Sequence, residues 1–417
     1  MELSDEGMFG SSKSAKRGSQ GEEIEMIRRQ FLLGTVSAIT AIAVGRASAN
    51  AAETVKVGLV LSMSGPFSQY GRQMENGIRL FMKEHGDTVA GKKIELVIKD
   101  DGGLAPDRAR RAAQDLLVRD KVDILAGFTF TASAMAAAPL AKEAGVAMIV
   151  MNASSSGITS ASPYMIRVGQ TLPQITEPAA RYAGEQGYKT IYTLVSDITA
   201  GHDAEASFVR GLQAVGGGVS GSLRVPAQNP DFAPFVQRIK DAKPDAVFVW
   251  LLPGEATISF IKEFNQRGLR AEGVTMLGTG DLTDELTIEA TGEPGIGVVT
   301  TGHYSMAHAS PKNETFVKAY LADYPQDKWP NFLSVSAYDG MAALYRGLEK
   351  TGGDASGTAI TDALKGEAFE SPRGPIEIDP ATRDIVQTVY VRRVERVNGR
   401  LSNVEFHDFP KSRDTTQ

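Results

Sequence analysis

Three segments of the chain carry hydroxyl side chains directly after an apolar run, and two of them also carry aromatic rings. They span residues 62–71, 127–133 and 152–156. Where such a segment opens a helix, the unpaired backbone N–H groups and the partial positive charge of the helix N-terminus attract an anion such as a carboxylate. Aromatic side chains in the same segments would enclose an apolar body. This combination predicts capture of a small carboxylate-bearing molecule.

Each segment taken alone has a plainer interpretation. The serines of residues 154–156 would only cap the next segment, and Phe128 and Phe130 would be core residues. Three such segments at equivalent positions favour a binding cleft, because ligands of open α/β sheets bind at the carboxyl ends of the strands.

No pattern in the sequence asks for catalytic or cofactor chemistry. The glycines of residues 216–221 have the spacing of a dinucleotide-binding loop, but they follow a predicted helix and precede a predicted strand, the reverse of the required order. Asp100 and Asp101 are interpreted as caps of a turn. The chain has no cysteine, and its five histidines are scattered. We therefore predict no catalytic residue, no metal site and no cofactor.

The strands that position these segments are recognised by short, β-branched apolar runs. Residues 55–61 are continuously apolar, typical of a strand covered on both faces. Further strands are expected at residues 94–99, 122–126, 146–151, 190–196, 221–225, 245–252, 274–277 and 295–301. Asn398-Gly399 predicts the turn of a C-terminal hairpin.

Helices are expected between these strands. They are predicted near residues 70–85, 106–119, 132–143 (with a break or kink at Pro139), 178–186, 203–215, 232–241 and 255–267, and residues 311–364 are mainly helical. Strand and helix at this spacing indicate βαβ units in a parallel sheet. Because the alternation restarts after residue 169, the fold class is α/β with two halves.

The N-terminal residues carry an export pattern. Residues 1–25 are polar, Arg28 and Arg29 then precede an apolar run, and small residues end that run. This pattern predicts a leader and twin-arginine-type signal peptide over residues 1–52, cleaved near residues 49–52. A buried helix is the alternative. Cleavage would give a periplasmic protein.

The charge and cysteine content of the chain limit the kinds of partner that we expect. The formal net charge of −6 gives no electrostatic reason to expect a nucleic acid. Without cysteine the chain has neither a disulfide nor the attachment point of a lipid anchor. We expect a monomer whose partner is a small molecule.

Several short motifs occur along the chain, and their order and spacing are more specific than any one motif. They are Ser64-Gly65-Pro66, Gln69-Tyr70-Gly71, Gly77, Asp100-Asp101, Leu125-Ala126-Gly127, residues 152–159, Val195-Ser196-Asp197 and Ala337-Tyr338-Asp339-Gly340-Met341. In this order and spacing the chain after the leader resembles the periplasmic solute-binding proteins of branched-chain amino-acid-type ABC transporters.

The resemblance implies a type I periplasmic binding fold, with two doubly wound Rossmann-like lobes joined by a three-strand hinge. The N-terminal lobe would comprise residues 53–167 and 303–373. The C-terminal lobe would comprise residues 168–302 and 374–410.

The resemblance also implies a set of ligand-binding positions. Tyr70 would lie against the ligand, and Thr131 (or Ser133) with Ser154 would bind its carboxylate. The second lobe would close with residues 197–202 and 250–253. The full expected set is Tyr70, Phe128, Phe130, Thr131, Ser133, Asn152, Ala153, Ser154, Thr199, His202, Trp250 and Asp281.

The implied function is that of an exported substrate-binding component of an ABC importer, which delivers its ligand to a membrane permease. Residues 197–203 and 302–305 look like the subgroup that handles aromatic acids, so an aromatic or other small carboxylic acid is favoured over a branched-chain amino acid. The alternatives are a secreted α/β hydrolase-type enzyme and a ligand sensor for a signalling receptor. We expect no enzyme activity.

Overall fold

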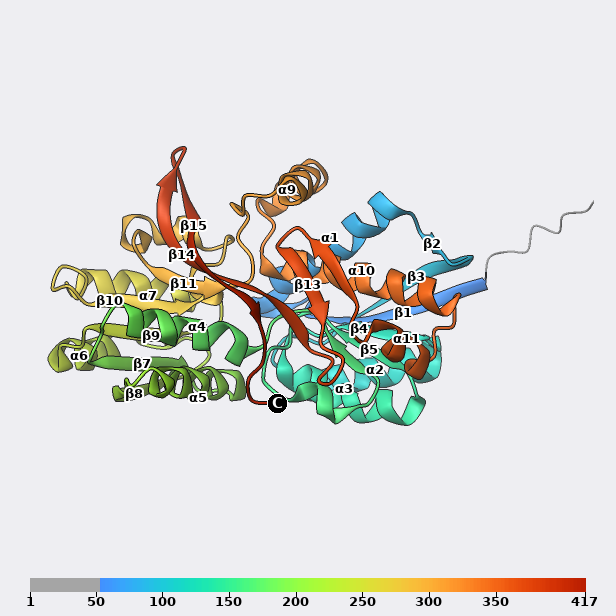
Figure 1. Cartoon of the computed structure of the whole chain (residues 1–417), viewed down its shortest axis with the longest axis horizontal. Helices are drawn as coiled ribbons and strands as arrows, with labels where there is room; N and C mark the ends of the chain where they lie inside the picture. Colours follow the sequence, from blue (N-terminus) through green and yellow to red (C-terminus); the bar gives the residue numbers. More distant parts are fainter. Residues whose placement is uncertain (1–52) are drawn as a thin grey trace, which may run out of the picture. The chain divides into compact units, whose positions relative to one another are not determined.

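The computed structural model describes residues 53–417, so the predicted leader and signal peptide lie outside the described residues. The first sheet has six strands in the order β2-β3-β1-β4-β5-β6 (Figure 1). All neighbouring pairs are parallel except β2 with β3. The strands are β1 (Glu53–Leu61), β2 (Thr88–Val89), β3 (Lys92–Asp100), β4 (Ile124–Gly127), β5 (Ala147–Val150) and β6 (Met165–Arg167).

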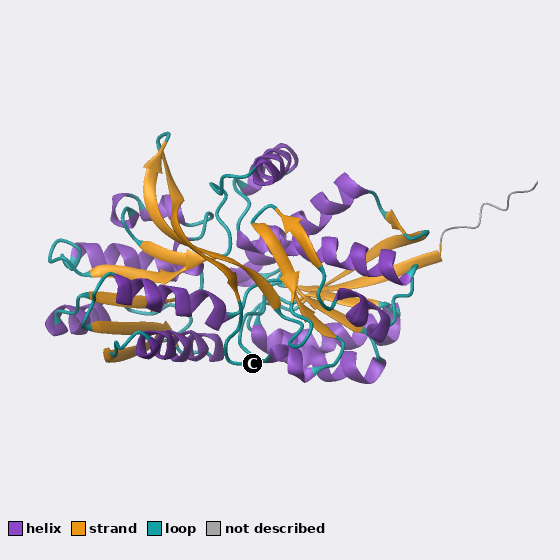
Figure 2. Cartoon of the chain, viewed as in Figure 1, coloured by secondary structure: helices purple, strands orange, loops and turns teal. Residues whose placement is uncertain are grey.

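Both faces of the first sheet are covered by helices, which explains the continuous apolar run of β1. Val57 and Leu59 pack with α1 (Ser68–His85) and α10 (Phe332–Thr351) in one core cluster. Val60 packs on the other face with α2 (Pro106–Asp115) and α3 (Thr131–Ala144). Figure 2 shows this layering, with strands between two layers of helices.

The second sheet begins with parallel strands and ends with antiparallel ones, in the order β12-β13-β14-β11-β10-β9-β7-β8, with β15 paired to β14. Strands β7 to β11 are parallel to one another, whereas β14 runs antiparallel to β11. The strands are β7 (Ile191–Ser196), β8 (Val219–Val225), β9 (Ala246–Trp250), β10 (Thr275–Thr279), β11 (Val299–Gly302), β12 (Ala368–Ser371), β13 (Gly374–Ile378), β14 (Ile385–Val397) and β15 (Arg400–Ser412).

The helices fill the connections predicted for them. They are α1 (Ser68–His85), α2 (Pro106–Asp115), α3 (Thr131–Ala144), α4 (Leu172–Glu185), α5 (Thr199–Ala214), α6 (Ala233–Ala242), α7 (Glu255–Gln266), α8 (Ile288–Thr291), α9 (Pro311–Asp323), α10 (Phe332–Thr351) and α11 (Gly357–Leu364). Of the helices within residues 53–417, none has the length and apolarity to span a membrane.

We call the six-stranded sheet with its covering helices the first lobe, and strands β7–β11 with their helices the second lobe. The chain passes from the first to the second after β6 and returns after β11 to form α9 and α10, which pack on α1. Strand β14 pairs with β13 near its start and with β11 further along. The lobe boundaries stay a prediction, and β12, expected in the N-terminal lobe, pairs with β13.

The predicted C-terminal hairpin is present. Strands β14 and β15 pair antiparallel, with Val397 opposite Arg400. Asn398 and Gly399 both have positive φ, 51° and 81°, the conformation that a two-residue hairpin turn requires.

Candidate functional site

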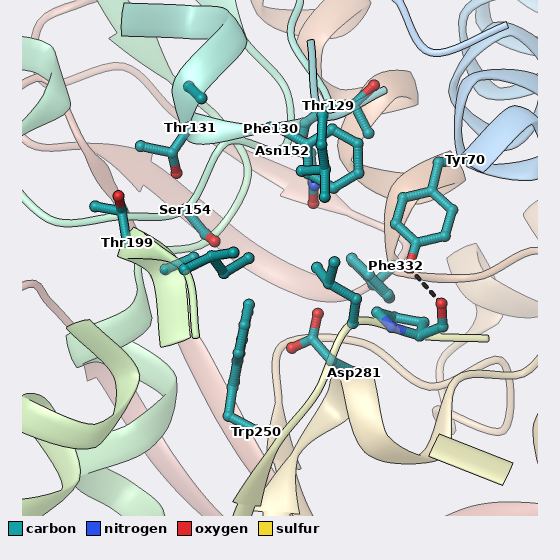
Figure 3. Close-up of a pocket in the computed structure, with 16 residues that line it drawn as sticks. Tyr70, Thr129, Phe130, Thr131, Asn152, Ser154, Thr199, Trp250, Asp281 and Phe332 are labelled. Atoms are coloured by element: carbon teal, nitrogen blue, oxygen red, sulfur yellow. Dashed lines mark hydrogen bonds between the residues drawn. The ribbon is translucent and has the colours of Figure 1, made fainter. Parts of the chain in front are cut away.

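A cavity of about 270 Å³ lies between the carboxyl ends of the strands of the two lobes. The first lobe lines it with segments that follow β3, β4 and β5 and with residues of α1 and α10. The second lobe lines it with segments that follow β7, β9 and β10. The lining residues are Tyr70, Leu104, Thr129, Phe130, Thr131, Ala132, Asn152, Ser154, Ile198, Thr199, Ala200, Trp250, Leu252, Pro253, Asp281 and Phe332 (Figure 3).

Helix α3 of the first lobe begins at this cavity. Its first residue is Thr131, and its N-cap residue, Phe130, has an extended backbone and no side-chain capping bond. The backbone N–H groups of the first turn precede the first intrahelical bond, from Ala134 N–H to the Phe130 carbonyl. They are therefore available to an anion in the cavity.

Helix α5 of the second lobe begins at the same cavity. Its N-cap residue, Ile198, also makes no side-chain capping bond, and Thr199 and Ala200 line the cavity. The first intrahelical bond runs from His202 N–H to the Ile198 carbonyl. Two helix N-termini, one from each lobe, thus present N–H donors and partial positive charge to one space.

Three hydroxyl groups lie at this end of the cavity, those of Thr131, Ser154 and Thr199 (Figure 3). The Thr131 hydroxyl bonds to Ser155, accepting from its backbone N–H at 3.2 Å and lying 3.1 Å from its hydroxyl. Within residues 53–417 the structure records no hydrogen bond to the hydroxyls of Ser154 and Thr199. Both can therefore donate to a bound carboxylate.

The middle of the cavity is apolar and largely aromatic. The rings of Tyr70 and Phe130 have centroids 5.8 Å apart, and each also contacts Phe67 edge-on. From the second lobe, Trp250 closes the opposite wall (Figure 3). Ring pairs of this geometry form an apolar surface at one wall of the cavity.

The far end of the cavity is acidic. Asp281 lines it and is 8% exposed, and its Oδ2 accepts a hydrogen bond from the Thr279 hydroxyl at 2.7 Å. Burial raises the pKa of the Asp281 carboxyl above its usual value, against the opposing effect of the Thr279 hydrogen bond.

Two hydrogen bonds join the lobes beside the cavity. The Tyr70 hydroxyl donates to the Pro253 carbonyl at 2.6 Å (Figure 3), and the Ser156 N–H donates to Asp203 Oδ2 at 2.6 Å. Burial raises the pKa of the Tyr70 hydroxyl well above its usual value, and nearby Asp284 and Asp281 add to this shift. The hydroxyl therefore keeps its proton and stays a donor.

The structure brings together most of the positions expected to bind the ligand. Tyr70, Phe130, Thr131, Asn152, Ser154, Thr199, Trp250 and Asp281 all line the cavity. Their contact with a ligand stays a prediction. Asn152 is oriented by donating from Nδ2 to the Thr129 carbonyl at 2.7 Å.

The other expected positions do not line the cavity. Phe128 and Ala153 are buried in the core between the first sheet and helices α2 and α3. Phe128 has a φ of 66°, directly after Gly127 with a φ of 101°, and this turn directs the Phe128 ring to the far side of the sheet from Phe130. Ser133 is fully buried within α3. His202 Nε2 lies 2.6 Å from Asp197 Oδ1, outside the cavity lining.

Eight lining positions were not in the expected set. Two of them, Phe332 and Leu104, also lie outside the segments expected at the cavity, whereas the other six lie within those segments: Thr129, Ala132, Ile198, Ala200, Leu252 and Pro253. Phe332 is the first residue of α10, whose N-cap Asn331 forms a capping box with Ser334. That box was a readable signal for the helix start. Nothing local indicates that this helix end faces the cavity.

Metal chemistry finds no support among residues 53–417, since no three His, Asp or Glu side chains there are arranged to hold an ion. Asp100 and Asp101, which were expected to cap a turn, serve loop structure. Asp100 accepts from Met63 and Gly102 N–H groups, and Asp101 accepts from the Ser62 hydroxyl at 2.8 Å.

The carboxyl ends of strands from both α/β lobes border one cavity. This arrangement defines a ligand-binding clamp of the periplasmic binding class. Comparison of the sequence agrees, because the family described as "Periplasmic binding protein" matches residues 54–400. The chain belongs to this family. The predicted family and the predicted fold are confirmed.

Individual relatives are similar along nearly the whole described chain. "Leu/Ile/Val-binding protein homolog 6" of Brucella melitensis is 40% identical over 380 residues, 90% of this chain and 97% of the relative. The solute-binding protein of an ABC transporter from Rhodopseudomonas palustris BisB5, solved with 3,4-dihydroxybenzoic acid, is 47% identical with a TM-score of 0.83. A counterpart from R. palustris HaA2, solved with p-hydroxybenzoic acid, is 41% identical with a TM-score of 0.83. Each structure covers 87% of this chain and 99% of its own.

Proposed function

We propose that this chain is the exported solute-binding component of an ABC importer and captures a small aromatic carboxylic acid between its lobes. One observation carries the proposal: the uncapped N-termini of α3 and α5, from opposite lobes, meet at one cavity. A carboxylate between them would satisfy N–H groups of both lobes at once. The ligand would thereby stabilise the closed arrangement that a permease receives.

The rest of the cavity supports an aromatic body. Phe130, Trp250 and Phe332 line the space next to the hydroxyl-rich end. Two similar solute-binding proteins were solved with hydroxybenzoic acids. The names of the Brucella relatives keep a branched-chain amino acid as the second candidate, and the acidic Asp281 is the group that would meet its ammonium.

The proposal extends to location and partners. The arginine pair and apolar run before residue 50 support export to the periplasm, and the absence of cysteine supports a protein without a lipid anchor. A membrane permease is the proposed partner, and no catalytic role is proposed. A pull-down of the membrane partner distinguishes an importer component from a ligand sensor.

The test is isothermal titration calorimetry of the mature protein with benzoate, 4-hydroxybenzoate and leucine. We expect an aromatic acid to bind more tightly than leucine. Ser154→Ala removes a donor to the carboxylate and is expected to weaken aromatic acid binding about tenfold.

Ser220→Ala is the matched control. The Ser220 hydroxyl donates to the Ile191 carbonyl at 3.1 Å, away from the cavity, so this variant should bind like the wild type. Equal losses in the two variants would contradict the carboxylate assignment. Tight binding of leucine with no binding of aromatic acids would favour the second candidate.

A further inference from the structure

Asp281 is a buried carboxylate that this chain only partly satisfies. It lies in the short 3-10 turn Gly280–Thr283 after β10 and is 8% exposed. Among residues 53–417 the only side chain that hydrogen-bonds to it is Thr279, which donates to Oδ2. No side chain among these residues hydrogen-bonds to its Oδ1, and Asp281 lines the cavity.

Among the described residues, no lysine, arginine or histidine forms an ion pair with Asp281. Arg392 favours its charged form from a distance, but the Arg392 guanidinium donates to the Tyr304 carbonyl and to the Thr300 hydroxyl. A buried carboxylate with an unfilled acceptor site is costly unless a donor reaches it. The cavity is the one direction from which a ligand donor can come.

The position of Asp281 relative to the anion-binding end restricts that donor. Figure 3 shows Thr131, Ser154 and Thr199 at one side of the cavity and Asp281 at the other. In an α-amino acid the carboxylate and the ammonium are carried by one carbon. In an aromatic acid with a hydroxyl on the far side of the ring, the two polar groups are separated by an apolar disc, as the cavity requires.

We infer that Asp281 selects aromatic carboxylic acids that carry a hydrogen-bond donor on the ring, opposite the carboxylate. This inference rests on the proposed function and adds the chemical subclass of its ligand. The ring hydroxyl donates to the free Asp281 oxygen while the carboxylate meets the N-termini of α3 and α5. Thr279 is a positioning residue, because its hydroxyl holds the other oxygen.

The experiment measures one ratio, the dissociation constant of benzoate divided by that of 4-hydroxybenzoate, by calorimetry on the mature protein. We expect a ratio of about ten or more for the wild type, since a hydrogen bond to a charged acceptor is among the stronger ones. 4-Methoxybenzoate, which keeps the oxygen but lacks the proton, should bind no better than benzoate.

Two variants make the test specific. Asp281→Leu has the same branched shape without an acceptor and should lower the ratio to about one while benzoate still binds, which also demonstrates a folded site. Asp362→Asn is the matched control, because it neutralises an exposed carboxylate of α11 outside the cavity lining and should leave the ratio unchanged.

The outcomes separate the two proposals. If both acids bind the wild type with a ratio near one, or if Asp281→Leu keeps the wild-type ratio, the role of Asp281 is overturned and the proposed function stands. If neither acid binds the wild type, the proposed function itself fails. If Asp281→Leu binds neither acid, a circular dichroism spectrum that matches the wild type would overturn the inference. If the Asp281→Leu protein does not show the wild-type spectrum, the same ratio of dissociation constants is measured for Asp281→Asn instead. A wild-type ratio in Asp281→Asn, together with tight binding of 4-methoxybenzoate, would overturn the inference.

Discussion

At the residue scale, Asp284 is the most strongly perturbed acid behind the cavity. It is 1% exposed and accepts hydrogen bonds from Leu286 N–H and from Asn331 Nδ2, each at 2.9 Å. Burial, with the neighbouring Glu285 charge, raises the pKa of Asp284 to about 8. The folded protein therefore holds this proton at pH values where the unfolded chain has lost it.

The sign of the resulting pH dependence follows from that difference. Between about pH 4 and pH 8 the folded state binds more protons at Asp284 than the unfolded state, so stability falls as the pH rises. The expected slope from this group is about 1.4 kcal/mol for each pH unit in that window. Asp284→Asn cannot titrate, so its melting temperature minus that of the wild type should increase from pH 5 to pH 8.5. A difference that stays constant across this range in thermal scans would contradict the assignment.

The sequence alone predicted only some of the residues that line the cavity and did not distinguish them from neighbouring residues that are buried in the core. Phe128 and Phe130 are two positions apart and were expected together, but the positive φ of Phe128 directs its ring to the core. Such a turn follows from the packing of the Gly127 backbone against Val60, which no local pattern encodes. The segments that hold Thr131 and Ser154 were foreseen because hydroxyls after an apolar run are a local signal, and the family resemblance singled out these two residues.

At the element scale, the sequence predicted most strands to within one or two residues, because fully buried strands are marked by apolar runs. The first residues of the helices were predicted less accurately. Helix α5 was expected from residue 203 but begins at Thr199, and α4 was expected from residue 178 but begins at Leu172 after a Thr171–Gln174 capping box. The break or kink expected at Pro139 does not end α3, which continues to Ala144.

The early start of α5 depends on Gly201. A Cβ atom at this position would lie 1.9 Å from the Ser196 carbonyl oxygen, so only glycine lets the first turn of α5 pack against the end of β7. The same residue looks like a loop signal in the sequence. For this reason the second helix N-terminus at the cavity was not foreseen.

A prediction follows for Gly201→Ala. The methyl group should push the N-terminus of α5 away from the cavity and weaken aromatic acid binding at least about tenfold, through lost N–H contacts. Gly218→Ala is the control, because Gly218 has no atom near its Cβ position and no positive φ. Calorimetry on both variants, with circular dichroism to verify folding, checks this. Wild-type affinity in a folded Gly201→Ala protein would rule out a role for this helix end.

At the scale of the whole molecule, the proposed function requires the lobes to close on the ligand. Ligand binding should therefore reduce the radius of gyration in small-angle scattering. Tyr70→Phe keeps the ring but removes the bond to the Pro253 carbonyl. It should lower ligand affinity about tenfold while leaving the compaction at saturation intact. An unchanged radius of gyration on binding in the wild type would refute closure.

Two of the hydrogen bonds that join the lobes, unlike the side-chain pair Asn331–Asp284, are built in the same unequal way. In each, a side chain of one lobe meets a backbone group of the other: Tyr70 with the Pro253 carbonyl, and Asp203 with the Ser156 N–H. The backbone partners survive nearly any replacement at their positions, a proline at residue 156 excepted. As related sequences diverge, residues 156 and 253 are therefore free to drift as far as these bonds are concerned. Residues 70 and 203, one in each lobe, are the places where a single inherited change would remove one of these two bonds.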